Sequence, residues 1–335
     1  MKTRILPLLL MAGLLAPAAA QAPAPGRSLK QIATIDLPGP PGKRFDYLMV
    51  VPEEGWLLAN HLAAGLLYVI DLKTNKLIKA IADVPGAEGV EYVPSLKKAY
   101  TADWYENKVA VIDMKTMQVV KKIATEAKPD GMAYVSTYHK LFVSDERGKA
   151  EAIIDVDRDE VITTLHFESA TGMPQWDSVG KTVWVNLQDQ NTIIEIDQAT
   201  NKVNGRWPVG QCKGNHGMAL DTQNRRAFLV CESNDLMTVF DMEAHKTVAA
   251  LAMPKGADVI KFDPGLKRIY VACSSGVIAV YHQDDADHYS KVEDFPVQPK
   301  VHSLAVDTRT HRLYAPEEQA NGKPMARMVV YEAVK

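Results

Sequence analysis

Acidic residues and histidines recur along the sequence at a nearly constant spacing, each just before a short apolar run. The stretch GNHGMALD (214–221) shows the pattern, with His216 ahead of the apolar residues. Equivalent positions are separated by 42 or 44 residues. These seven positions, called the slot residues below, are Asp46, Glu88, Asp130, Gly172, His216, Asp258 and His302. Six of them can ionise or bind a metal, so their chemistry depends on whether the fold brings them together.

Carboxylates that converge on a narrow opening repel one another, so they take up protons, pair with cationic histidine or hold a cation. Oxygen ligands with an added imidazole suit Ca²⁺, Mg²⁺, Mn²⁺ or Zn²⁺. We therefore predict one divalent cation at Glu88, Asp130 and Asp258. If the protein is an enzyme, His216 and His302 are the candidate catalytic acids or bases. The alternative is that these polar residues are hydrated and hydrogen-bond loop backbones.

A second set of polar residues ends or follows the next strand of each repeat and is predicted to share the same face. Exposed aromatic rings beside polar groups suit a flat ligand such as a sugar ring, although packing of the loop explains them equally well. The predicted ligand-binding residues are Asp46, His61, Asp103, Trp104, Tyr105, Asp145, Asn186 and Glu232.

The elements that would position these residues are short strands in a repeat. Three aligned segments begin EGVEYVPSLKKAYTAD, DGMAYVSTYHKLFVSD and HGMALDTQNRRAFLVC. Each unit holds four short stretches that alternate apolar and polar residues, which is typical of half-buried strands. An aspartate ends the third stretch in five units and predicts a hairpin turn. A four-stranded unit repeating at about 40–45 residues predicts an all-β, seven-bladed β-propeller of antiparallel blades.

The two ends of the repeat region predict how the ring closes. The last unit supplies only three strands, whereas residues 29–39 form a lone strand with no unit of their own. That strand would complete the last blade and remove an open sheet edge. We therefore expect a single domain over residues 29–335, in which the innermost strand of each blade lines a central channel and the slot residues ring one mouth of it.

Particular strand motifs resemble a known family. AYTAD followed by VAVID, LFVSD followed by AIID, and RIYVACSSGVIAVY are similar to the units of YVTN-repeat (YncE-like) β-propellers. The resemblance covers residues from about 30 to 335. It implies a seven-bladed propeller in an exported protein, and it assigns no catalytic residue because such folds host unrelated activities.

The N-terminus and the composition bear on location. Residues 1–22 combine a basic start, an apolar stretch and small residues, which predicts a cleavable signal peptide, and residues 23–28 a flexible leader. We expect a periplasmic or secreted protein. The net charge of −3 gives no sign of a nucleic-acid partner, and the mature chain has no apolar run long enough to span a membrane.

The cysteines and the motifs that are missing limit the cofactors. Three cysteines allow at most one disulfide, with Cys212–Cys231 the favoured pair, Cys231–Cys273 a less favoured one, and buried free thiols the alternative. There is no Cys-x-x-Cys-His and no phosphate-binding glycine loop, so neither haem c nor a nucleotide is expected.

Three functions remain open from the sequence. The first is a binding protein that takes a small molecule or a periplasmic protein on the upper face, which we define as the face with the slot residues. The second is a metal-dependent hydrolase, similar to lactonase propellers, or a lyase, with its site at the channel mouth. The third is an accessory protein of a periplasmic redox system. Repeat regularity and the lack of a catalytic motif favour the first.

Overall fold

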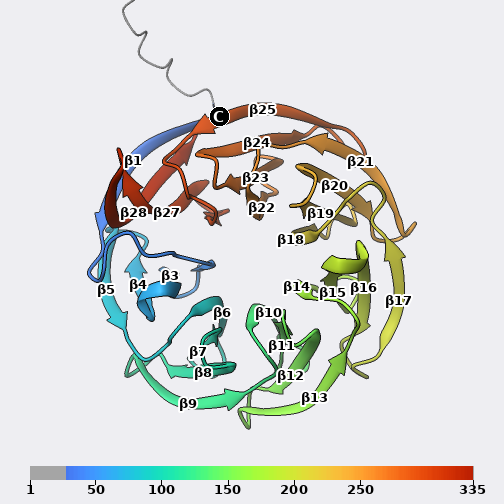
Figure 1. Cartoon of the computed structure of the whole chain (residues 1–335), viewed down its shortest axis with the longest axis horizontal. Coiled ribbons are helices and arrows are strands. Elements are labelled where there is room, and N and C mark those ends of the chain that lie inside the picture. Colours follow the sequence, from blue (N-terminus) through green and yellow to red (C-terminus); the bar gives the residue numbers. More distant parts are fainter. Residues whose placement is uncertain (1–27, 335) are drawn as a thin grey trace, which may run out of the picture.

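The computed structural model describes residues 28–334, which form seven four-stranded antiparallel sheets arranged around a central axis (Figure 1). This confirms the predicted seven-bladed propeller. The predicted signal peptide, residues 1–22, and nearly all of the leader lie outside the described residues. Helix is confined here to two short 3-10 turns, η1 (Leu62–Ala64) and η2 (Gln188–Gln190).

The first four blades each run from the axis to the rim in chain order. Blade 1 is β2 (Leu48–Val51), β3 (Trp56–His61), β4 (Leu66–Asp71) and β5 (Lys76–Ile81). Blade 2 is β6 (Ala87–Val93), β7 (Lys98–Asp103), β8 (Lys108–Asp113) and β9 (Gln118–Ala124). Blade 3 is β10 (Pro129–Val135), β11 (Lys140–Asp145), β12 (Ala150–Asp155) and β13 (Glu160–His166). Blade 4 is β14 (Thr171–Asp177), β15 (Thr182–Leu187), β16 (Thr192–Asp197) and β17 (Val203–Pro208).

The remaining blades complete the ring. Blade 5 is β18 (Asn215–Asp221), β19 (Arg226–Cys231), β20 (Leu236–Asp241) and β21 (Lys246–Ala252). Blade 6 is β22 (Ala257–Asp263), β23 (Arg268–Cys273), β24 (Val277–Gln283) and β25 (Tyr289–Pro296). Blade 7 is β26 (Ala305–Asp307), β27 (Arg312–Ala320), β28 (Lys323–Ala333) and, on its outer edge, β1 (Leu29–Asp36).

Strand β1 closes the ring as the sequence predicted. It pairs antiparallel with β28, with Leu29 opposite Ala333 and Ile35 opposite Met328. Figure 1 shows the blue strand β1 lying outside the red blade at the rim. The first described strand thereby covers an edge that the last blade would otherwise leave open.

The core lies between neighbouring blades rather than at the centre of the molecule. Leu58 and Val69 of blade 1, for example, pack in one cluster with Tyr92, Ala99 and Ile112 of blade 2. The apolar residues of the two middle strands are almost fully buried because sheet faces stack around the ring. This packing makes the blades a rigid support for the residues around the channel.

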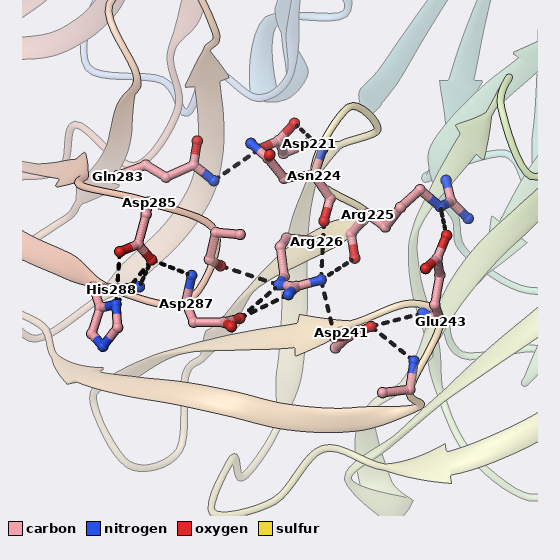
Figure 2. A network of polar contacts seen from close by, with 12 residues as sticks. Asp221, Asn224, Arg225, Arg226, Asp241, Glu243, Gln283, Asp285, Asp287 and His288 are labelled. Atoms are coloured by element: carbon pink, nitrogen blue, oxygen red, sulfur yellow. Dashed lines mark hydrogen bonds and ion pairs between the residues drawn. The ribbon is translucent and has the colours of Figure 1, made fainter.

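Turn aspartates and a polar network fasten the blades on the side opposite the slot residues. Figure 2 shows Arg226 of β19 bonded to Asp241 in its own blade and to Asp287 of blade 6, at N–O distances of 3.0 and 2.7 Å. Gln283 donates a 2.8 Å bond to Asp221 across the same blade boundary. These contacts are between protein groups and serve to join blade 5 to blade 6.

The strand-ending aspartates accept backbone N–H bonds inside their hairpins, which confirms their predicted turn role. Asp71, for instance, accepts a 2.6 Å bond from the Thr74 N–H. The equivalents that do the same are Asp113, Asp155, Asp197 and Asp241.

A disulfide joins Cys212, in the loop before β18, to Cys231 at the end of β19, and Cys273 is a buried free thiol. Because the bond closes a loop with a sequence separation of 19 residues, we expect the Cys212→Ser/Cys231→Ser variant to lose about 3 kcal/mol of unfolding free energy. Urea denaturation with and without a reducing agent measures this. Equal stability of the oxidised protein and the variant would contradict the prediction.

Candidate functional site

Local irregularities in the innermost strands place the slot residues at the mouth. In β6 the register changes between Ala87, opposite Asp103, and Val90, opposite Thr101, so Glu88 and the next residue together face one partner. The same bulge occurs in β10, β18 and β22 at the slot positions. A β-bulge re-aims side chains away from the sheet pattern, which directs these residues to the channel mouth.

Glycine after the slot lets adjacent inner strands approach closely. A Cβ at Gly89 would lie 2.1 Å from the Asp130 carbonyl oxygen, and one at Gly217 would lie 2.1 Å from that of Asp258. The bulged carbonyls are also capped: Asn60 donates 2.5 and 2.8 Å bonds to the carbonyls of Glu88 and Gly89. The slot positions are therefore held by backbone packing and buried amides rather than by loose loops.

Five of the seven slot residues, all except Gly172 and His302, line a depression of about 320 Å³ that we call the mouth depression. Nearly all of its wall is polar or charged. Its lining residues are Arg44, Asp46, Tyr47, Glu88, Trp104, Asp130, Glu146, Arg147, Gln188, His216, Glu232 and Asp258. Six carboxyl groups thus face three cationic or potentially cationic side chains across a small space.

His216 lies at the centre of this wall. Its Nε2 is 3.1 Å from the Tyr47 hydroxyl, 3.7 Å from Asp258 and 3.9 Å from Asp130. Burial alone would lower the pKa of His216, but the carboxylates of Glu232, Asp130 and Asp258 raise it to about 9. Three ligand atoms, one each from His216, Glu232 and Asp258, lie within 4.8 Å of one another.

Glu88 and Asp130 are two carboxyl residues beside His216, and each affects the pKa of the other. Burial and the neighbouring Asp130 and Asp46 carboxylates hold the pKa of Glu88 well above its ordinary value. Burial raises the pKa of Asp130 to about 7, against the opposing effect of His216. Two neighbouring buried carboxyls with raised pKa values favour the protonated form of one of them, so Asp130 can give or take a proton near neutral pH.

A second depression of about 520 Å³ adjoins the first and shares Arg44, Glu232 and Asp258 with it. Arg44 joins two slot residues, with N–O distances of 3.0 Å to Asp46 and 4.0 Å to Asp258. Lys300 and His302 line only this second depression. The mouth therefore has an acidic half around His216 and a more basic half around His302.

His302 is hydrogen-bonded through one ring nitrogen, and the other ring nitrogen lies near a carboxylate. Its Nδ1 donates a 2.9 Å bond to the Lys300 carbonyl, and its Nε2 lies 3.7 Å from Asp46. Burial opposes the charged ring, but Asp46 raises the pKa of His302 to about 9. Burial likewise works against the Asp46 carboxylate, whose pKa is nevertheless lowered by His302 and Arg44.

These shifts predict a pH-dependent contribution to stability. A histidine whose pKa rises from 6.5 to about 9 on folding stabilises the fold fully below pH 6.5, and the contribution disappears as the pH rises through 9. We expect the melting-temperature difference between wild type and His302→Gln to shrink from pH 6 to pH 9.5. A difference that stays constant over that range would contradict this prediction. His166→Gln, at an exposed position on β13, is the control.

Five residues predicted from the sequence to bind ligand do not line the mouth depression, namely Tyr105 at its rim and four buried residues. Asp103 and Asp145 are fully buried; burial raises their pKa values to about 8 and about 7. Asn186 donates a 2.6 Å bond to the His216 carbonyl and so supports the slot. His61 stacks on Phe45 with ring centroids 4.0 Å apart, and burial lowers its pKa to about 4.

The structure brings the other predicted site residues together at the mouth. Trp104 and Glu232 join the slot carboxylates Asp46, Glu88, Asp130 and Asp258 in the depression. Tyr105 does not line it; its side chain is 56% exposed and lies at the rim, where Lys128 sits over both aromatic rings. Sequence reasoning did not identify Arg44, Tyr47, Arg147, Lys300 or Glu318 as site residues.

Several solved structures have a similar fold at low sequence identity. A chain of the Kuenenia stuttgartiensis hydrazine synthase aligns with a TM-score of 0.76 at 16% identity, covering 88% of this chain and 96% of that one. The WD40 repeats of RRP9 align at 0.77 and 9% identity, covering 93% and 99%. A chain of a mitotic checkpoint complex aligns at 0.75 and 13% identity over 100% of both chains. Such identities establish the propeller fold alone.

Neither a family model nor a curated protein matches the sequence, so the YVTN-type family remains a prediction. Within residues 28–334, none of the helical segments is long and apolar enough to cross a membrane. The fold is consistent with a scaffold for binding or interaction.

Proposed function

We propose that this protein is an exported binding protein that takes a small polar ligand at the channel mouth with the help of one divalent cation. The observation that carries the proposal is the convergence of His216, Glu232 and Asp258, whose ligand atoms lie within 4.8 Å of one another on the wall of the mouth depression. One imidazole and two carboxylates leave open coordination positions for a ligand, as in metal sites that bind substrates.

The ligand set differs from the one predicted from the sequence, which combined Asp258 with Glu88 and Asp130. Burial raises the pKa of both Glu88 and Asp130, so these two carboxyls are less readily ionised to hold a cation. His216 and Glu232 offer a nitrogen and an oxygen beside Asp258 instead. Because an imidazole nitrogen suits Zn²⁺ better than Ca²⁺ or Mg²⁺, we propose Zn²⁺ or Mn²⁺ as the cation.

Titration of the mature, metal-stripped protein tests the proposal. Calorimetry with Zn²⁺, Mn²⁺, Ca²⁺ and Mg²⁺ is expected to give one site per chain, with Zn²⁺ or Mn²⁺ tightest, and the bound metal is expected to raise the melting temperature. Absence of stoichiometric binding by all four ions would overturn the cation and leave a purely organic binding site.

A metal-dependent hydrolase, lactonase-like, or a lyase is the second candidate. It is favoured by the Glu88–Asp130 pair, because Asp130 lies 3.9 Å from His216 and its pKa of about 7 suits a general base at neutral pH. Hydrolysis of a panel of lactones that is lost on Asp130→Asn, with the cation still bound, would favour this reading. A folded, metal-loaded protein without turnover on the panel leaves the binding protein ahead.

A further inference from the structure

A separate cavity of about 220 Å³ lies along the central channel, next to the mouth depression. Tyr47 lines both spaces, and its hydroxyl bonds to His216, so this side chain stands between them. A volume of this size holds about seven waters or one small molecule. Its lining residues are Tyr47, Leu48, Met49, Val50, Gly89, Val90, Glu91, Gly131, Met132, Met173, Gln175, Lys261, Ala305 and Val306.

Two opposite charges face this cavity from different blades. Glu91 lies on β6 of blade 2 and Lys261 on β22 of blade 6. Both are three residues beyond a slot residue, at a position that forms a second ring down the channel. The members of this ring are Met49, Glu91, Ala133, Gln175, Ala219, Lys261 and Ala305. Only Glu91 and Lys261 are charged, and the small alanines leave room beside them.

Glu91 and Lys261 attract each other across the cavity but do not form a close ion pair. Within residues 28–334 no ion pair of 4.0 Å or less involves either of them. Burial raises the pKa of Glu91 to about 8, against the opposing effects of Lys261 and of the Tyr134 backbone. Burial also lowers the pKa of Lys261. Burial of two charged groups without a close ion-pair contact is costly, so a ligand that carries both charges would stabilise the charged forms of Glu91 and Lys261.

Most of the other lining side chains are apolar, although polar atoms make up more of the exposed wall than apolar atoms do. Met49, Val90, Met132 and Met173 surround the charged pair, and Gln175 is the one side-chain amide among the lining residues. Glu91 and Lys261 both retain partial exposure, so the cavity is reachable from solvent. A ligand for this space carries a positive end, a negative end and a small apolar group.

We propose that the channel cavity binds a small aliphatic amino acid as its zwitterion. The ligand carboxylate accepts from the Lys261 ammonium, and the ligand ammonium donates to the Glu91 carboxylate. A side chain of one to three carbons lies against the methionines and valines. The proposal is independent of the cation at the mouth, because none of the three candidate metal ligands lines this cavity.

Calorimetric titration of the mature protein with L-alanine, in the presence of EDTA, tests the proposal. We expect one site for L-alanine, and at least about tenfold weaker binding of acetate and of methylamine, because each of these carries only one of the two charges. Glu91→Gln and Lys261→Met are each expected to weaken L-alanine binding at least about tenfold.

Glu160→Gln and Lys202→Met, both at exposed positions, are the matched controls and should bind like wild type. Binding of acetate as tightly as L-alanine would reduce the site to an anion site and overturn the proposal. So would a folded wild type that binds no amino acid in a series from glycine to valine. A further contrary outcome is that no ligand binds and the Glu91→Gln/Lys261→Met double variant has a higher melting temperature than wild type. The two charged residues would then be hydrated groups that close the channel and bind no ligand.

Discussion

We expect His216→Ala to bind Zn²⁺ more than about 100-fold more weakly than wild type, because it removes the only nitrogen of the proposed ligand set. Altering a residue that merely supports a metal ligand costs about 10- to 100-fold in affinity, so losing a ligand itself should cost more. Glu232→Gln and Asp258→Asn are expected to act in the same direction. The measurement is competition for Zn²⁺ against a chelator of known affinity, with circular dichroism to show that each variant is folded.

Two comparisons make this prediction specific. His288→Ala and Glu243→Gln alter side chains that are 77% and 72% exposed and absent from the mouth, so they should bind Zn²⁺ like wild type. Glu88→Gln separates the two ligand sets: it should keep the cation if His216, Glu232 and Asp258 hold it. If the Glu88→Gln variant lost Zn²⁺ and the Glu232→Gln variant kept it, the ligand set proposed from the structure would be refuted. The set predicted from the sequence, Glu88, Asp130 and Asp258, would then be favoured.

The slot residues could be found from sequence because the fold repeats. Each unit is one blade, so residues 42 or 44 apart occupy equivalent places around the axis, and the alignment alone puts Glu88, Asp130, His216 and Asp258 on one ring. The same counting left β1 without a blade of its own, which predicted the closure by β1 and β28. Because each repeat contacts only its neighbours, counting the repeats in the sequence gives the number of blades in the ring.

In the second set of predicted residues, Asp103 and Asp145 are one position away from the residues that line the mouth. Side chains along a strand alternate between faces, so a shift of one residue exchanges one environment for the other. Asp103 and Asp145 end β7 and β11 and are buried, whereas the residues after them, Trp104 and Glu146, line the mouth. Trp104 and Glu232, which were predicted from the sequence, are the residues after a strand end, and the same rule would also have selected Glu146 and Gln188.

Other parts of the site depend on geometry that the repeat does not encode. Arg44 and Lys300 lie in irregular loops before β2 and β26, outside the strands that align between blades. Arg44 reaches the slot residues of blade 1 and blade 6, Asp46 and Asp258, only because ring closure places blades 6, 7 and 1 side by side. The channel charges Glu91 and Lys261 belong to the repeat, but their separation across the axis follows from ring closure rather than from spacing.

The closing strand should be the most sensitive element of the fold. We expect Ile35→Asp on β1 to lower the unfolding free energy by about 3–5 kcal/mol, because it buries a carboxylate with no partner in an apolar cluster. Ile35 is 7% exposed, lies opposite Met328 and packs in the cluster that includes Tyr314. Loss of β1 would leave β28 as an unpaired edge, so the variant should also aggregate more readily than wild type.

Thr34→Asp is the matched control, since Thr34 is the adjacent residue on the same strand and its side chain is exposed. It adds the same charge one position away and should change the unfolding free energy by less than about 0.5 kcal/mol. Urea denaturation measures both variants, and light scattering follows aggregation. If the two variants were equally stable, β1 would be a dispensable cover rather than the closure of the ring. A synthetic peptide of residues 28–37 that raises the melting temperature of Ile35→Asp would instead show that the vacated edge of β28 accepts a replacement strand.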